Sequence, residues 1–245
     1  MARDGDSTPY LMSNSAKGCP VTAYPFSMSV WFYKPASHSS MCIASVGATG
    51  STQINGIYIT SGGLAQMYIG GGLAVSSSIG LSTGWSNIVA IEVGVTNHKI
   101  VVNGVSNSST VSLALTTSLD RWGALAFVSS SPGFTGASGQ PVADLGVWNV
   151  ALTSTEATDM YNGRLSPLMI RPQNLVAYCP LNDGDGDARD IIGGRHLIET
   201  DGSVALVDNP PLRYLRRSFS GFTPGEVVIP PQLPRLRSVF RGFSF

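Results

Sequence analysis

Apolar and polar residues alternate with a period of two over much of the chain. The segment FSMSVWFY, residues 26–33, places Phe, Met, Val and Phe at every second position against Ser, Ser, Trp and Tyr. Similar short segments, separated by Gly- or Asn-containing turns, recur at residues 41–47, 56–62, 64–71, 85–94, 98–105 and 121–130. Regularly spaced short strands with turn signals between them predict an all-β fold, a sandwich or jelly roll.

One helix interrupts this pattern in residues 144–163, DLGVWNVALTSTEATDMYNG. The stretch begins with strand alternation and then places Ala, Met and Tyr at helical spacing. Thr153 can cap the first turn, and Glu156, three residues later, can reach back to it, which is a capping box. Asn162 and Gly163 supply the stop signal. We therefore expect a strand followed directly by one short helix.

Several motifs together indicate a family. The helix stretch contains VWNVALTSTEATDMYNG, an early strand reads FSMSVWF, the strand of residues 98–105 carries Val-Asn-Gly, and residues 174–187 read NLVAYCPLNDGDGD. This set resembles the laminin-G-like domains of the concanavalin A-like lectin/glucanase superfamily, over Phe26 to Val207. In many members the NLVAYCPL-type segment opens the domain, whereas here it follows the helix. The resemblance implies an antiparallel two-sheet jelly-roll sandwich of the concanavalin A-like type.

The ends of the chain differ from this central part. Residues 1–24 show little periodicity, and we expect an N-terminal arm there. Residues 25–208 form the expected laminin-G-like jelly-roll domain. Residues 209–245 contain four prolines between positions 224 and 234, which disfavour a helix and favour extended conformations. We expect this last segment to be an extended C-terminal arm, either disordered or ordered on a partner.

Charge and composition narrow the function classes. Hydrophobic residues make up 43% of the 245 residues and charged residues 12%, with a net charge of zero. The whole chain therefore has no electrostatic bias toward nucleic acid or anionic membranes. The start MARDGDSTPYLMSN has no apolar run of the signal-peptide type, so we expect a protein made in a host cytoplasm without an export signal. Cys19, Cys42 and Cys179 are expected to be buried, reduced thiols.

No catalytic arrangement is evident, so we do not expect an enzyme or a bound organic cofactor. Glucanases of the superfamily use Glu-x-Asp-x-x-Glu on one strand, and Glu92, Glu156, Glu199 and Glu226 do not fit that spacing. The three histidines fit no metal triad and are expected in loops or at the surface. They are His38, His98 and His196.

A calcium site is one candidate. Four aspartates alternate with glycines in a short loop, which supplies oxygen ligands at every second position. The alternative is a solvated turn in which Asp190 caps the next segment. The four residues are Asp183, Asp185, Asp187 and Asp190.

A glycan site is a second candidate. Exposed aromatic residues such as Phe134 or Trp85 could stack on a sugar ring. The alternative is that all four tryptophans belong to the core, because each lies in or beside a strand. They are Trp31, Trp85, Trp122 and Trp148.

The C-terminal arm is the third candidate and the main partner-binding segment. Its arginines can pair with carboxylates of a protein, and its last residues, RSVFRGFSF, could add as an edge strand. Single-stranded nucleic acid is the alternative partner of a basic, aromatic segment, but the prolines and the strand pattern favour protein. The expected contact residues are Arg213, Arg216, Arg217, Phe219, Phe222, Arg235, Arg237, Phe240, Arg241, Phe243 and Phe245.

The jelly roll, the lack of an export signal and the arm are together typical of standalone laminin-G-like modules in tailed-phage particles. We expect a non-enzymatic virion structural protein, a capsid decoration (cement) or fibre-type protein, bound to the major capsid protein or other virion subunits and forming a homo-oligomer. The alternative is a lectin-like adhesion module for host-surface or environmental glycans. Neither hypothesis involves nucleic acid or a membrane.

Overall fold

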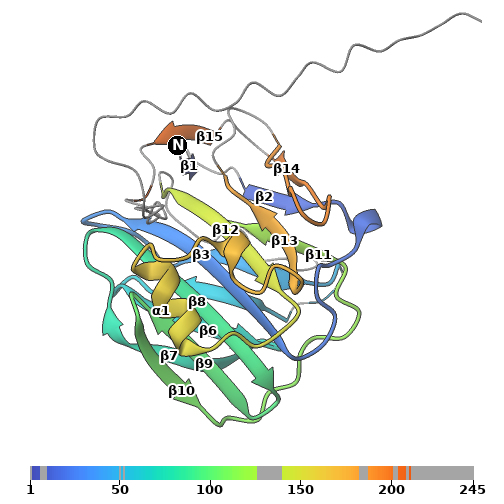
Figure 1. Cartoon of the computed structure of the whole chain (residues 1–245), viewed down its shortest axis with the longest axis horizontal. Coiled ribbons are helices and arrows are strands. Elements are labelled where there is room, and N and C mark those ends of the chain that lie inside the picture. The colour runs from blue at the N-terminus through green and yellow to red at the C-terminus, as the bar shows by residue number, and fades with distance from the viewer. Residues whose placement is uncertain are drawn as a thin grey trace, which may run out of the picture. The chain divides into compact units, whose positions relative to one another are not determined.

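A computed structural model describes residues 2–5, 10–49, 51, 53–125, 140–181, 187–200, 204–207 and 210. Residues Met1–Tyr214 group into one compact unit. Its described part consists of strands with one α-helix and two short 3-10 helices (Figure 1). The elements are β1 Ala2–Gly5, β2 Tyr10–Ser13, η1 Ser15–Lys17, β3 Phe26–Lys34, β4 Met41–Gly47, β5 Asn55–Ile59, β6 Leu64–Ile69, β7 Gly72–Gly80, β8 Gly84–Gly94, β9 Asn97–Val102, β10 Val105–Ser109, β11 Arg121–Ala124, β12 Val142–Trp148, α1 Ser154–Tyr161, η2 Pro167–Met169, β13 Leu175–Cys179, β14 Leu197–Thr200 and β15 Val204–Val207.

The strands form two sheets in which every described pairing is antiparallel. The first sheet, sheet A, has the order β10-β9-β8-β3-β12-β1-β15, and β13 also pairs with β12. The second, sheet B, has the order β14-β2-β11-β4-β5-β6-β7. The predicted all-β jelly-roll sandwich with one short helix is therefore confirmed.

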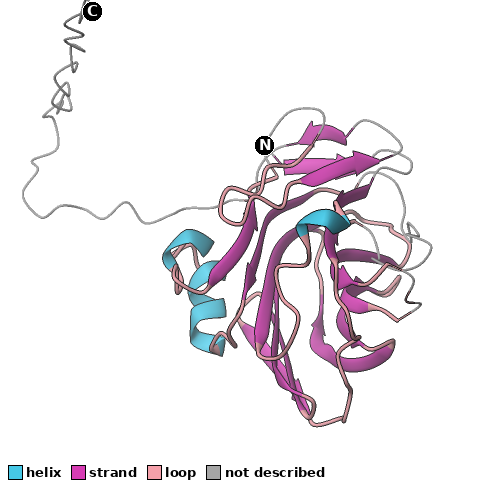
Figure 2. Cartoon of the chain, turned by 90° about the vertical axis from the view of Figure 1, so that its right-hand side faces the viewer, coloured by secondary structure: helices cyan, strands magenta, loops and turns pink. Residues whose placement is uncertain are grey.

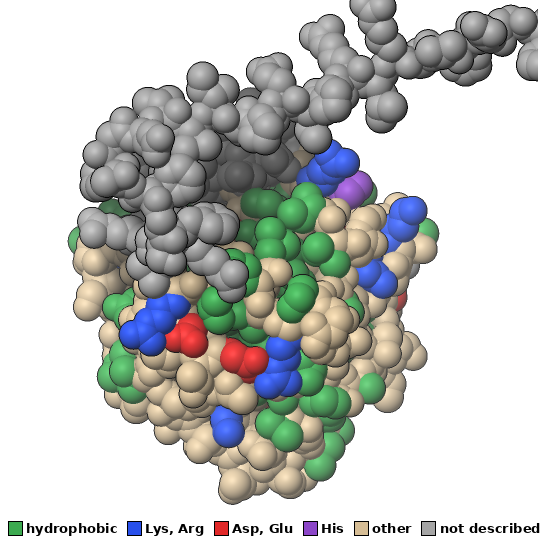
Figure 3. All heavy atoms as spheres, in the orientation of Figure 1, with side chains coloured by type: hydrophobic (Ala, Val, Ile, Leu, Met, Phe, Trp, Pro, Cys, Tyr) green, Lys and Arg blue, Asp and Glu red, His purple; other side chains and the backbone are tan. Residues whose placement is uncertain are grey.

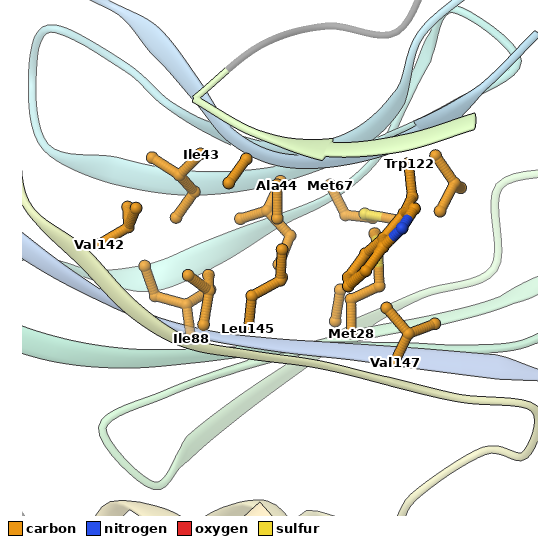
Figure 4. Close-up of a cluster of buried hydrophobic side chains, with 14 of the residues drawn as sticks. Met28, Ile43, Ala44, Met67, Ile88, Trp122, Val142, Leu145 and Val147 are labelled. Atoms are coloured by element: carbon orange, nitrogen blue, oxygen red, sulfur yellow. The ribbon is translucent and has the colours of Figure 1, made fainter. Parts of the chain in front are cut away.

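The core lies between the two sheets. The apolar positions of the FSMSVWFY segment, including Phe26, Met28 and Phe32, are all buried in it. Figure 4 shows Met28, Val147 and neighbours from sheet A facing Trp122 and residues of sheet B. Period-two alternation thus put one face of each strand into a shared interior.

Helix α1 lies on the outer side of sheet A, against β8 and β9 (Figures 1 and 2). The predicted capping box is present: Thr153 Oγ1 accepts from the Glu156 N–H, and the Thr153 N–H donates to the Glu156 carboxylate. Ala157 and Met160 pack with Trp148 in a second apolar cluster. The helix therefore covers apolar side chains on the outer face of sheet A.

The N-terminal residues differ from the expected arm. Strand β2 pairs with β11 and β14 in sheet B, and β1 pairs with β12 and β15 in sheet A. Leu11 is fully buried in the core. The segment belongs to the sandwich because its short strands complete both sheets, whereas four residues per strand are too few to show a clear period in the sequence.

The C-terminal arm, residues 209–245, lies outside the described residues except for Pro210. None of the helices in the described part of the chain is long and apolar enough to cross a membrane.

Candidate functional site

Four aromatic side chains gather on the outer face of sheet A, and we call them the aromatic platform: Trp31, Tyr33, Trp85 and Tyr161. Trp31 and Tyr33 occupy the outward positions of β3, and Trp85 lies directly opposite Tyr33 in the β3–β8 register. Tyr161 is the last residue of α1. Residues far apart in the sequence therefore meet where β3 ends and β8 begins.

The platform consists of two ring pairs. The Tyr33 and Trp85 rings are 5.6 Å apart between centroids and nearly perpendicular, at 76°. The Trp31 and Tyr161 rings are 6.3 Å apart and more nearly stacked, at 29°. Both arrangements are favourable for aromatic pairs and hold the rings in place.

The exposure of the four rings is graded. Trp31 is buried, at 4% exposure, and packs with Ala143 and Trp85. Tyr33 and Trp85 are half-buried, and Tyr161 is 38% exposed. A half-buried aromatic ring keeps an apolar surface in contact with solvent, which a sugar ring can cover.

Buried amides and hydroxyls fix the strands beneath the platform. The Asn103 side chain accepts from the Asn87 N–H at 2.9 Å and donates to Ser86 Oγ at 3.2 Å. The Asn87 amide in turn donates to Ser29 Oγ at 3.5 Å. Because Ser86 and Asn87 follow Trp85 directly, this network holds the platform strand rigidly to its neighbours.

The remaining tryptophans are core residues, as the alternative interpretation predicted. Trp122 and Trp148 are fully buried, and their indole N–H groups donate to the carbonyls of Arg195 at 3.0 Å and Ile170 at 2.8 Å. Trp85 is thus the tryptophan with a solvent-facing ring. Phe134, the other predicted sugar contact, lies outside the described residues.

A buried pair of titratable residues, Glu92 and His98, was not expected. The prediction that His98 lies in a loop or at the surface is wrong: both side chains have no exposed area, and His98 Nδ1 makes a short contact with Glu92 Oε2. Burial raises the pKa of Glu92 to about 7, although His98 opposes this shift. On β8, Glu92 continues the series of inward positions that includes Ile88 and Ala90, and His98 lies directly opposite Glu92 on β9. This period of two was the sequence signal for their burial.

The other two histidines are less enclosed. His38 Nε2 lies 2.9 Å from the Thr60 carbonyl, in a half-buried position. His196 is exposed, and its Nδ1 accepts from the Asp190 N–H at 3.1 Å.

Of the aspartates predicted to bind calcium, Asp190 has a structural role. Its Oδ1 accepts from the N–H groups of Tyr178, Ile192 and Gly193, and its Oδ2 accepts from that of Arg195, at 2.9–3.1 Å. A carboxylate surrounded by four donors organises a turn. Asp190 therefore caps the following segment, as the alternative interpretation proposed.

The rest of the calcium prediction is untested. Asp183 and Asp185 lie outside the described residues, and Asp187 is exposed. Within the ranges that the structure describes, no group of three or more His, Cys, Asp or Glu side chains is placed to hold a metal.

The three cysteines, all within described ranges, are buried thiols. Burial raises the pKa of Cys19 to about 12 and that of Cys42 well above its usual range. We therefore expect Cys19 and Cys42 to stay protonated at neutral pH, as structural cysteines do.

An open depression of about 290 Å³ lies at the opposite end of β3, where residues 20–25 line it together with Asn149. It contains no tryptophan.

The expected contact residues of the C-terminal arm, from Arg213 to Phe245, lie outside the described residues, so their role stays a prediction.

Comparisons with known proteins identify the fold. No protein-family model and no curated protein sequence matches the chain. A Bacteroides ovatus protein with a proposed carbohydrate-binding role matches in structure with a TM-score of 0.60 and 14% identity, over 85% of this chain and 60% of that one. The chain thus spans less than two thirds of that protein's length.

Two further structures match less well. A Limulus polyphemus pentraxin has a TM-score of 0.49 at 18% identity, over 66% of this chain and 82% of that one. A Trypanosoma rangeli sialidase mutant has a TM-score of 0.43 at 14% identity, over 56% of this chain and 23% of that one. At these values only the Bacteroides likeness supports an argument, and it concerns the fold: the chain is an all-β jelly-roll sandwich of two antiparallel sheets.

Proposed function

We propose that the protein is a non-enzymatic carbohydrate-binding module that attaches to host-surface or environmental glycans. The observation that carries the proposal is the half-buried Tyr33–Trp85 pair on the outer face of sheet A. Aromatic rings at a surface bind the apolar faces of sugar rings, and burying them adds little conformational cost because the rings are already held. The proposed role of the Bacteroides ovatus protein with the same fold supports this function.

Three of the described carboxylates already make structural contacts, which favours a binding role over hydrolysis. Glycoside hydrolysis needs two carboxyl groups that reach the substrate. Glu92 is enclosed in the core, Asp190 is engaged by four backbone N–H groups, and Glu156 caps α1 and pairs with Arg171 at 2.7 Å. Each of these groups already has a structural function.

A glycan array probed with the full chain and with Trp85→Ala tests the proposal. We expect at least one class of glycan to bind the wild type and to bind the variant about tenfold more weakly, the loss of one stacked ring. Tyr68→Ala is the matched control, because Tyr58 and Tyr68 form a similar perpendicular pair on sheet B, 5.7 Å apart. Equal binding by the wild type and Trp85→Ala, or a loss confined to Tyr68→Ala, would contradict the placement of the site.

We also propose, as a second candidate, that the protein is a virion component, a capsid decoration or fibre-type protein. The supporting observation is in the sequence: between residues 209 and 245 arginines are interleaved with phenylalanines, and Glu226 is the single acid. Such a segment suits carboxylate-bearing protein partners such as the major capsid protein or a second copy of the chain. The two functions are compatible, since a particle protein can also bind glycans.

Deleting residues 215–245 tests the second candidate, because it removes most of the arm and leaves the compact unit Met1–Tyr214 intact. We expect the deleted protein to keep its far-UV circular dichroism and to lose co-sedimentation with particles. Full occupancy on particles after the deletion would show that the arm does not provide the attachment.

A further inference from the structure

We propose that the buried Glu92–His98 pair is a pH-sensitive switch: when the pair loses a proton, it releases residues 110–116 from one end of the sandwich. We call these residues the strap. They lie between β10, at the edge of sheet A, and β11 in sheet B, and form neither a helix nor a strand. The switch is a property of the fold and does not rest on the proposed glycan or virion function.

The first half of the strap is held by side chains that can titrate. His98 Nε2 lies 2.9 Å from the Val111 carbonyl. The Tyr24 hydroxyl donates to the Leu113 carbonyl at 3.1 Å. One backbone hydrogen bond accompanies them, from the Leu113 N–H to the Val95 carbonyl in the β8–β9 turn at 2.8 Å. Because this stretch belongs to no strand ladder, these few contacts fix its position.

The second half of the strap is anchored by an amide that does not titrate. Asn55 Nδ2 donates to Thr116 Oγ1 at 2.7 Å, and both residues are buried. Asn55 Oδ1 accepts from the Gly70 N–H at 2.8 Å, which fixes the amide in turn. The two halves of the strap should therefore respond differently to pH, with Thr116 as the fixed end.

Most of the strap is already solvent-exposed, so moving it exposes little apolar surface. Residues 110–112 and Ala114 are exposed, whereas Leu113 and Leu115 are half-buried against the core. Segments with few buried apolar contacts open locally at a lower free energy than the whole fold. The loss of one anchor therefore changes how often the strap is open.

The Glu92–His98 pair needs two protons to make all of its hydrogen bonds. The carbonyls beside His98 Nε2, those of Val95 and Val111, only accept, so this nitrogen needs one proton. The hydrogen bond between His98 Nδ1 and the Glu92 carboxyl group needs another, on either group. After the loss of one proton, a neutral imidazole has a single N–H for both sides. The ionised carboxylate is the stronger acceptor, so the imidazole donates to it and releases the Val111 carbonyl.

The surroundings of Glu92 place this proton loss near neutral pH. Its side chain has no exposed area, and its Oε1 has no hydrogen-bond partner among the described residues. Burial without partners disfavours the charged carboxylate, and the pKa of Glu92 is accordingly raised to about 7, although His98 opposes the shift. The pair therefore keeps both protons below about 7 and loses one above it.

The neighbours of the pair add no other titration in this range. Tyr24 faces Glu92, and burial together with Glu92 raises the pKa of its hydroxyl to about 12, so it stays protonated. Phe26 is the apolar partner of Glu92 on β3, and neither the strap nor β6 and β7 contain a charged residue. Lys99, next to His98, belongs to the outer face of sheet A. Figure 3 shows few charged side chains on that face, and β8 and β9 separate it from the pair.

Amide hydrogen exchange of the full chain, followed by NMR from about pH 6 to about pH 8.5 and corrected for the intrinsic exchange rate, tests the switch. We expect the protection of the Leu113 amide to fall about tenfold as the pH rises through about 7, the loss of one hydrogen bond. The Gly70 amide, held by Asn55, should change much less. Glu92→Gln removes the titration and still donates to His98 Nδ1, so its strap should stay protected throughout.

Three results would overturn the switch. They are a Leu113 protection that does not change with pH, an equal fall at Leu113 and Gly70, and a fall in Glu92→Gln as large as in the wild type. The ¹⁵N chemical shifts of the wild-type His98 ring give a second readout that needs no variant. The proton should move from Nε2 to Nδ1 across the same pH range, and a ring that keeps its Nε2 proton would contradict the release of Val111.

Discussion

Glu92 and His98 lie directly opposite each other on β8 and β9, and their side chains meet in the interior of the sandwich. His98 Nε2 lies 2.9 Å from the Val111 carbonyl and 3.2 Å from the Val95 carbonyl, and since carbonyls only accept, this nitrogen carries a proton. His98 Nδ1 makes its short contact with Glu92 Oε2. The pair thus ties the β8–β9 turn and the segment after β10 to the core.

This pair predicts that stability depends on pH. Burial raises the pKa of Glu92 from 4.5 to about 7. The stability contributed by protonated Glu92 is therefore fully present below pH 4.5 and is lost as the pH rises through about 7. Thermal melts across that range should therefore show the melting temperature falling as the pH increases. Glu92→Gln keeps the shape and removes the titration, so its melting temperature should change less. An equal pH dependence in both proteins would show that Glu92 is not responsible.

The capping box predicts a measurable loss at Thr153. Thr153→Ala removes the acceptor for the Glu156 N–H and should lower the free energy of unfolding by about 1 kcal/mol. Thr155→Ala is the matched control, because Thr155 is exposed in the same helix turn. Urea denaturation of both variants measures the difference, and equal stabilities would contradict the cap.

Glu156 adds a pH dependence of the opposite sign. Burial alone would raise its pKa, but the hydrogen bonds from Arg171 and Thr153 outweigh it and lower the pKa below its usual value. The stability contributed by ionised Glu156 is therefore present above pH 4.5 and is lost as the pH falls through the lowered pKa. As the pH is lowered into the acidic range, the Arg171→Met variant should therefore lose less stability than the wild type does. Denaturant melts of both proteins at several acidic pH values measure this difference. A loss equal to that of the wild type would exclude the Arg171 contribution.

Asp190 is expected to be important for stability. Asp190→Ala leaves four backbone N–H groups without their acceptor and should lower the free energy of unfolding by at least about 2 kcal/mol. Asp190→Asn keeps one acceptor oxygen and should lose less, and Asp187→Ala, at an exposed position, should lose least.

Calcium added to the wild type tests the remaining prediction for Asp183 and Asp185: a higher melting temperature that disappears in Asp183→Asn supports a site, and no shift argues against it.

Gly104 connects the β9–β10 hairpin with helix α1. Its φ is +81°, and a Cβ there would lie 3.3 Å from Thr158 and 3.5 Å from the Tyr161 ring. Gly104→Ala should therefore lower the free energy of unfolding by about 1 kcal/mol, because an L residue is strained at this φ and Thr158 must shift slightly. Gly80→Ala is the control, since a Cβ at Gly80 meets nothing within 4 Å. Urea denaturation measures both variants, and equal losses in Gly104→Ala and Gly80→Ala would contradict the strain at Gly104.

Features that depend on near neighbours in the sequence could be predicted without the structure. The alternation in residues 26–33 predicts which side of β3 faces the core between the sheets, and Thr153 with Glu156 predicts where α1 begins. Asn103 and Gly104, both with positive φ, form the predicted hairpin turn. In each case the responsible interactions lie within one strand, turn or helix turn, so the residue pattern is sufficient.

Other features depend on which segments meet, and only the tertiary structure decided them. Strand β2 is too short to have a periodic signal, and it is a strand because β11 and β14 pair with it. The phase of β8 places Glu92 on the inward side, but the pairing of β8 with β9 brings His98 opposite it. Trp85 was a candidate from the sequence, but its ring joins a platform because Tyr33 lies opposite it and α1 ends beside the neighbouring Trp31. The sequence by itself thus determined the sandwich and the phase of its strands, whereas the long-range packing of outward-facing side chains determined the candidate site.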